Sequence, residues 1–125
     1  MRCRYLAIMI RTAILLLMVQ NLWAGEADVV DVQVSKSAEN KYAFHVTVRH
    51  ADSGWDHFAD KWEVLAPDGS VLGTRVLAHP HVDEQPFTRS LYGVAIPAGI
   101  KKVTVRAHDK VHGWGGKSIT VDLPQ

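Results

Sequence analysis

The sequence predicts one all-β domain, a single antiparallel sandwich of two sheets with about seven strands, behind an N-terminal signal peptide. Three observations predict this class. Several short segments alternate apolar and polar residues with period two, and turns rich in proline, glycine and aspartate separate them. No segment after the leader carries a capped helical pattern. Seven short strands with regular turns are typical of a two-sheet sandwich, here over residues 28–125.

The predicted leader spans residues 1–24. An apolar run over residues 13–19 follows three basic residues, Arg2, Arg4 and Arg11. We expect cleavage after Ala24, with Ala27 as the alternative. The run is much shorter than the roughly 20 residues that a membrane span needs, so we expect no membrane anchor after cleavage. The leader predicts a periplasmic or secreted protein.

The start of translation has two candidates, Met1 and Met9. A chain starting at Met9 would enter the apolar run sooner, because Arg11 and Thr12 interrupt the longer version. Cys3, the one cysteine of the sequence, leaves with the leader in either case. The mature chain then offers no disulfide, no thiolate ligand and no cysteine nucleophile.

The charge of the mature chain is close to neutral. Residues 1–24 hold three of the fourteen lysines and arginines and none of the thirteen acidic residues, so the mature net charge is −2 with neutral histidines. Without a basic run, the sequence argues against nucleic acid or an anionic membrane as the partner. The partners that remain are a metal ion or a periplasmic protein.

The first four strands follow from alternation. Residues 30–35 and 44–49 each place valines or phenylalanine on one face and polar residues on the other, with Val30, Val32 and Val34 inward. Residues 58–64 place Phe58, Trp62 and Val64 inward. A Pro-Asp-Gly-Ser turn at 67–70 leads into a fourth strand at 71–78, whose phase is ambiguous.

The last three strands close the predicted domain. Residues 86–96 form the fifth strand, with a kink near Gly93, and Pro-Ala-Gly at 97–99 forms the next turn. Residues 103–107 and 119–123 alternate again and form the sixth and seventh strands. A small barrel is the alternative closure.

In strand number, in the absence of disulfides and in Trp62 on the third strand, the mature chain resembles the immunoglobulin-like and fibronectin type III-like superfamily. The resemblance covers the whole mature chain but implies architecture only. The chain is also similar to small secreted bacterial proteins that carry three segments and to which we attach no activity. The segments are His79-Pro80-His81, Gln85–Leu91 and Val111-His112-Gly113.

Six of the seven histidines fall in or beside loops at one predicted end of the sandwich. In an up-and-down order, the second, fourth and sixth strands run the same way, so the segments that follow them lie together. Those segments hold, in chain order, His50 and His57, His79 and His81, and His108 and His112. Imidazole is the commonest protein ligand for zinc, copper and nickel, so this end predicts a metal site.

His79-Pro80-His81 is the most specific part of that pattern. Proline keeps the segment extended, and residues i and i+2 of an extended chain point the same way, so both imidazoles could reach one ion. His50 is in phase with the buried valines of its strand, and His112 or His57 would complete a set of three or four ligands. A thiol-free histidine site favours Cu(II) or Zn(II) over Cu(I).

Several alternatives stay open. The same loops could form a non-catalytic module that grips a protein or a glycan, through Trp55, Trp114, Asp83 and Glu84. Clustered histidines could also sense pH. A metal-dependent hydrolase ranks last, because no nucleophile elbow, HExxH motif or phosphate loop is present, and we expect no enzyme.

Structural roles compete with the functional ones at single residues. His45 fits a solvated strand face, His108 a structural hydrogen bond, and His50 a cap on the core. For both loop tryptophans we expect packing over the sandwich end in preference to stacking on a sugar or peptide. Arg89 lies in phase with apolar neighbours and calls for a carboxylate partner, either Glu84 or Asp60.

Overall fold

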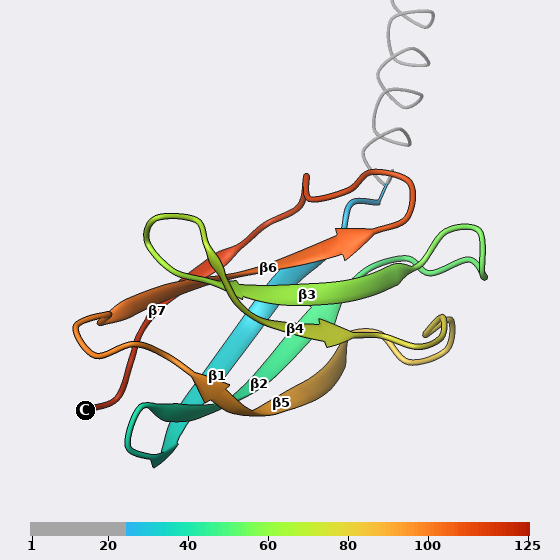
Figure 1. Ribbon diagram of the computed structural model, residues 1–125. Helices are drawn as coiled ribbons and strands as arrows, with labels where there is room; N and C mark the ends of the chain where they lie inside the picture. Colours follow the sequence, from blue (N-terminus) through green and yellow to red (C-terminus); the bar gives the residue numbers. More distant parts are fainter. Residues whose placement is uncertain (1–24) are drawn as a thin grey trace, which may run out of the picture.

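A computed structural model describes residues 25–125 of the chain, and the predicted leader with both candidate starts lies outside the described residues. The described chain forms seven strands in two sheets (Figure 1). Their bounds are β1 (Asp28–Ala38), β2 (Lys41–Arg49), β3 (Ala59–Leu65), β4 (Val71–Val76), β5 (Phe87–Ala95), β6 (Lys102–Asp109) and β7 (Ile119–Asp122). Among these residues no helix is long and apolar enough to cross a membrane.

The two sheets contain three and four strands, in the orders β1-β2-β5 and β4-β3-β6-β7. Every pairing within them is antiparallel. The predicted fold class, an antiparallel two-sheet sandwich of seven strands, is therefore confirmed.

The core lies between the sheets and follows the alternation of the sequence. Phe44, Val46 and Val48 of β2 are fully buried, and burial alternates along β6 in the same way. Trp62 of β3 is also fully buried, as predicted. Burying large apolar side chains of this kind contributes about 1.5–3 kcal/mol each, which allows a domain without disulfides to hold together.

Two irregularities change the phase of the strands. The register of β2 with β5 shifts opposite Gly93, whose φ of 64° glycine adopts without strain, so the predicted kink is confirmed. A second shift lies between Val29 and Asp31 of β1. It turns Val29 fully inward, whereas Val30, Val32 and Val34 are half-buried and alternate with exposed polar residues, as the sequence predicts.

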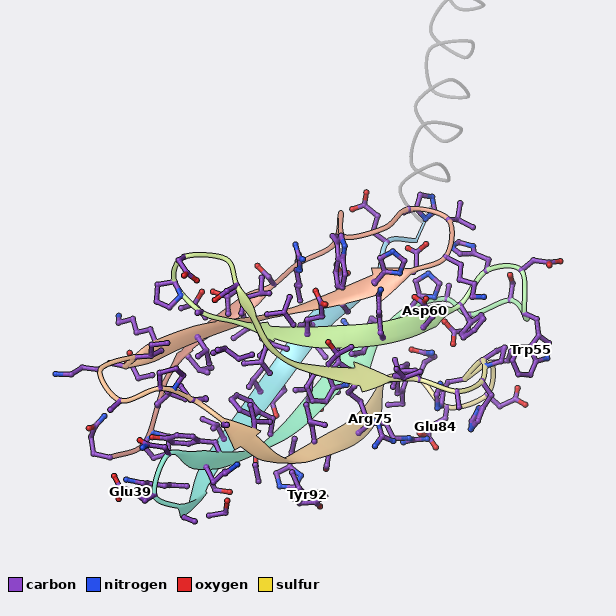
Figure 2. The ribbon with its side chains drawn as sticks, viewed as in Figure 1. Glu39, Trp55, Asp60, Arg75, Glu84 and Tyr92 are labelled. Carbon is purple, nitrogen blue, oxygen red and sulfur yellow. The ribbon has the colours of Figure 1, made fainter. Side chains whose placement is uncertain are left out.

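One end of the sandwich gathers the loops that leave β2, β4 and β6, and the described chain also begins there (Figure 1). Figure 2 shows Trp55 and Glu84 at this end and Glu39 at the opposite one. The alternating direction of consecutive antiparallel strands brings these loops together. We call this end the histidine pole.

Candidate metal centre

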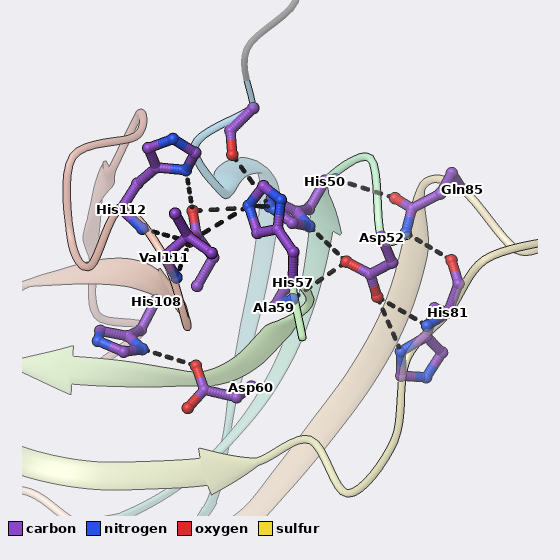
Figure 3. Close-up of polar contacts among 12 residues, drawn as sticks. His50, Asp52, His57, Ala59, Asp60, His81, Gln85, His108, Val111 and His112 are labelled. Atoms are coloured by element: carbon purple, nitrogen blue, oxygen red, sulfur yellow. Dashed lines mark hydrogen bonds and ion pairs between the residues drawn. The ribbon is translucent and has the colours of Figure 1, made fainter. Parts of the chain in front are cut away.

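His50 occupies the middle of the histidine pole (Figure 3). It is the first residue after β2 and is 2% exposed. Its Nδ1 is hydrogen-bonded to Asp52 Oδ1. Its Nε2 lies 3.0 Å from the carbonyl oxygen of Gly25 and 3.2 Å from Nε2 of His57. The two ring nitrogens therefore face different surroundings, a carboxylate on one side and a group of acceptor atoms on the other.

Asp52 fixes the orientation of that ring. Its buried carboxylate also accepts the backbone N–H of Ala59 at 3.0 Å and that of His81 at 2.7 Å. With its oxygens held in this way, Asp52 keeps a proton on Nδ1 of His50, so in the neutral ring the lone pair is on Nε2. A carboxylate behind the imidazole is the usual arrangement for a metal-binding histidine.

His57 reaches the centre from a tight turn. Its N–H donates to Gly54 O at 3.2 Å, and its carbonyl accepts from Ser53 at 3.1 Å. Gly54 has a φ of 147°, a conformation that favours glycine. The turn folds the His57 ring back edge-on to His50, with centroids 4.7 Å apart, and leaves its side chain 24% exposed.

Asp109 supplies a carboxylate from the end of β6, and its side chain is fully buried. Its Oδ1 accepts the N–H groups of Val111 at 2.7 Å and His112 at 2.6 Å, in a turn that Gly113 closes with a φ of 71°. Burial alone raises the pKa of Asp109, but these two N–H groups, with the charges of His50 and His112, outweigh it and leave that pKa lowered. The carboxylate therefore stays ionised.

His50, His57 and Asp109 each turn a ligand atom to a common point, and these atoms all lie within 4.8 Å of one another. The Nε2 atoms of the two histidines are 3.2 Å apart, and they lie 3.6 and 3.5 Å from the Asp109 carboxylate. A tetrahedral ion with bonds of about 2.0–2.1 Å separates its ligands by about 3.3–3.4 Å. The spacing fits such an ion, and we call these three residues the His50 centre.

His112 stands beside the centre. Its Nδ1 lies 3.3 Å from Asp109 Oδ2, and its ring centroid is 5.1 Å from that of His57. Its side chain is one-third exposed. It therefore supports Asp109 from the solvent side, at the entrance to the centre.

His79 and His81 form a separate group on the far side of Asp52. The ring of His81 is stacked flat on Phe87, with centroids 4.0 Å apart, and the residue is 5% exposed. Both its ring nitrogens are buried, without a hydrogen-bond partner among residues 25–125. His79 is exposed, with Nδ1 3.0 Å from Pro80 O. The two imidazoles lie side by side, 4.6 Å apart, but outside the His50 centre.

The sixth histidine of the pole, His108, also lies apart from the centre. Its Nδ1 is 2.6 Å from Asp60 Oδ1, a structural hydrogen bond between β6 and β3. Its ring meets Trp114 edge-on, and the Arg106 guanidinium lies 4.0 Å from the centre of that indole. Trp114 is therefore packed on the outer face of the β3–β6 sheet.

The other residues of the predicted interaction module are on the surface. Trp55 is 67% exposed and meets Phe58 edge-on at 5.7 Å. Asp83 and Glu84 are exposed in the loop after β4. Glu84 pairs with Arg89 at 2.9 Å, so one of the two carboxylates predicted for Arg89 is its partner.

Sequence reasoning missed Asp52 and Asp109 as members of the site. Asp109 had a detectable signal: successive strand residues point to opposite faces, so Asp109 faces away from its neighbour His108 and inward. Asp52 had only its place two residues after His50. Its role depends on a loop that folds back, which no periodicity predicts.

Comparison with known proteins gives one relative. A protein from Halomicrobium mukohataei named "Putative lipoprotein" is 43% identical over 97 residues, which are 78% of this chain. The matched part is 47% of that protein, so the chain spans about half the length of this relative. No family model matches the chain. No solved structure matches it.

Proposed function

We propose that this protein is an exported, non-catalytic metal-binding protein that holds a divalent transition metal at the His50 centre. One observation carries the proposal: two fully buried carboxylates, Asp52 and Asp109, flank His50, and among residues 25–125 only histidines supply basic side chains within 4.0 Å of them. Buried carboxylates need a cation nearby. A divalent ion between His50, His57 and Asp109 supplies it and also takes up the converging lone pairs.

The rival source of positive charge is protonation of His50 itself. That state gives His50 one N–H at Nε2, which faces Gly25 O, His57 Nε2 and Asp109 Oδ2 at 3.0, 3.2 and 3.6 Å. One N–H forms one good hydrogen bond, so the other two acceptor atoms are left without a donor from His50. A metal ion binds several at once, so the convergence favours the ion.

The ligands also narrow the choice of metal. Two imidazoles and one carboxylate are hard or borderline donors that suit Zn(II) and Cu(II), whereas Cu(I) prefers the sulfur that the mature chain lacks. Asp52 behind His50 raises the basicity of that ligand. A carrier, chaperone or sensor of Cu(II) or Zn(II) is the role that follows.

The proposal also includes that the protein is exported and that its sandwich belongs to the immunoglobulin-like superfamily. The predicted leader supports export, and the name of the 43% identical relative is consistent with it. The strand orders β1-β2-β5 and β4-β3-β6-β7 support an immunoglobulin-like sandwich. We place the protein in the periplasm or outside the cell on these grounds.

A second candidate function has an observation of its own. Trp55, Val82 and Val111 are 67%, 55% and 60% exposed, and all three lie in loops of the histidine pole. Exposed apolar residues gathered at one end are typical of a surface that binds a protein or a glycan. Loss of partner binding in Trp55→Ala, without any effect of metal, would favour this function.

Calorimetric titration with Zn(II) and with Cu(II), after chelation, tests the metal proposal. We expect one saturable site in the native protein and a marked loss of affinity in His57→Ala, because one of the two imidazole ligands of the His50 centre is removed. His45→Ala is the matched control, since His45 lies on β2 and hydrogen-bonds Ser90 away from the pole. No saturable binding of either ion, or unchanged binding in His57→Ala, would overturn the proposal.

A further inference from the structure

Gly25, the first residue that the structure describes, lies directly against the His50 centre. Its carbonyl oxygen is 3.0 Å from Nε2 of His50, the nitrogen that faces His57 and Asp109 (Figure 3). A methyl group placed on its α-carbon would lie 3.9 Å from Cδ2 of His50 and from the side chain of Ala51. The backbone of Gly25 thus covers one side of the proposed metal position.

The next residues fix Gly25 in place. Ala27 is fully buried in the core, and its carbonyl passes so close to Gly116 that a side chain there would clash with it. Val29 N–H donates to Lys117 O at 2.9 Å, and Lys117 N–H returns to the Asp28 carboxylate at 2.8 Å. Gly25 therefore sits at the end of a short, well-held segment.

Cleavage after Ala24, the preferred position of the sequence analysis, makes Gly25 the first residue of the mature chain. The alternative, cleavage after Ala27, would remove a fully buried residue and the carbonyl that contacts His50. Core burial thus favours Gly25 as the new terminus. Cleavage there converts the nitrogen of Gly25 from an amide, which offers no lone pair to a metal, into a free amine.

We propose that the α-amino nitrogen and the carbonyl oxygen of Gly25 complete the metal site, so that the His50 centre binds its ion tightly only after the leader is removed. This rests on the proposed metal function. The nitrogen and oxygen of one residue close a five-membered chelate ring on an ion. An α-amino group also gives up its proton more readily than a lysine does, so it is an available ligand at neutral pH.

The complete set would contain three nitrogens and two oxygens, from the amine, His50, His57, the Gly25 carbonyl and Asp109. Such a nitrogen- and oxygen-rich set suits Cu(II). It also separates metal binding from synthesis, since the unprocessed chain offers an amide where the mature chain offers an amine. The metal would then be taken up in the compartment that removes the leader.

The test uses two proteins that differ by one residue. Every strand and every core residue that the structure describes lies between Ala27 and Leu123, so a protein of residues 25–125 keeps all of them. One protein begins with Gly25, and the control carries a single serine before it, which turns the amine into an amide and keeps the carbonyl. Circular dichroism checks that both fold, and Cu(II) affinity is measured by competition with a chelator.

We expect the protein that begins with Gly25 to bind Cu(II) at least about tenfold more tightly, since even an outer-shell partner is worth about 10- to 100-fold. Electron paramagnetic resonance should show one nitrogen ligand fewer in the serine-extended protein. Equal affinities and equal spectra would overturn this inference and leave the proposed function standing. Absence of binding in both proteins, or an affinity that His57→Ala leaves unchanged, would overturn both.

Discussion

The histidine pole contains two pairs of histidines, and the structure gives them different surroundings. His50 and His57 turn their Nε2 atoms toward each other and toward Asp109. The rings of His79 and His81 lie side by side at an interplanar angle of 35°, with His81 stacked flat on Phe87 and His79 exposed to solvent. The first pair converges with Asp109 on a common point, and the second pair belongs to no such group of three ligands among the described residues.

Asp52 explains how one pole accommodates both pairs. One of its oxygens holds the ring of His50, and the other holds the backbone of His81. The Asp52 carboxylate thus orients His50 so that its Nε2 can bind an ion. Its bond to the second pair goes to the backbone of His81 and leaves that imidazole ring unbound. Spacing in the sequence brings histidines close together, but a metal site also requires that lone pairs converge.

The largest expected effect is the loss of stability on substitution of Asp52, the residue that contacts both pairs of histidines. Asp52→Ala leaves His50 Nδ1–H and the N–H groups of Ala59 and His81 without their buried acceptor. We expect the free energy of unfolding to fall by about 3–5 kcal/mol, measured by urea denaturation. Asp83→Ala, in an exposed loop of the same pole, is the control and should change it by less than about 0.5 kcal/mol. Similar losses in both variants would contradict the role of Asp52.

The second effect is the stabilisation by metal, which should depend on His57 of the first pair and not on His79 of the second. At 100 times its dissociation constant, the ion should raise the free energy of unfolding by about 2.7 kcal/mol in the native protein. Thermal unfolding should show the same gain in His79→Ala and a clearly smaller gain in His57→Ala. The reverse result would move the site to His79 and His81, as the motif alone predicts.

The third effect is the dependence of stability on His81 and on pH. His81 has two buried ring nitrogens without partners, so His81→Phe should stabilise the fold by about 1 kcal/mol at pH 7. Burial, with the charges of Arg89 and His79, lowers the pKa of His81 below 6.5 in the folded state. As the pH falls, the unfolded chain therefore binds the proton first, and the free energy of unfolding of the native protein decreases below pH 6.5.

Urea denaturation of the native protein and of His81→Phe between pH 7 and pH 5 measures this effect. The difference in unfolding free energy should widen toward acid, because only the native chain carries His81. Parallel pH profiles would show that His81 is protonated as easily in the folded chain as in the unfolded one.

The sandwich was predictable because each strand buries one face. Each strand therefore shows the period-two alternation within its own few residues, whatever its partners are. It also predicted that six histidines share one pole, since the direction of antiparallel strands decides which loops meet. The bulge at Val29 escaped prediction, because a register shift leaves no mark on composition. Trp62 was predictable as core from its phase alone.

The ligands could be predicted only in part. His50, His57 and His112 were among the candidates, but the sequence favoured the His79-Pro80-His81 motif, which the structure leaves outside the His50 centre. Whether a loop side chain meets a given carboxylate depends on turns such as Gly54 and Gly113, which reverse the chain over a few residues. Gly25 lacks a functional side chain, so only its backbone, in three dimensions, draws attention to it.

The smallest expected effect is a change in the pKa of His81 caused by two charged residues near it, Arg89 and Glu84. Arg89 lies in a partly exposed pair with Glu84, and its charge is one of the causes that lower the pKa of His81. Arg89→Gln should raise that pKa, and Glu84→Gln should lower it further, because the glutamate acts in the opposite direction. Proton resonances of the His81 ring, followed against pH, measure both shifts. Stability should change by less than about 1 kcal/mol in either variant, as is usual for an exposed pair. Shifts of the same sign would show that loop rearrangement, rather than charge, decides how readily the buried imidazole is protonated.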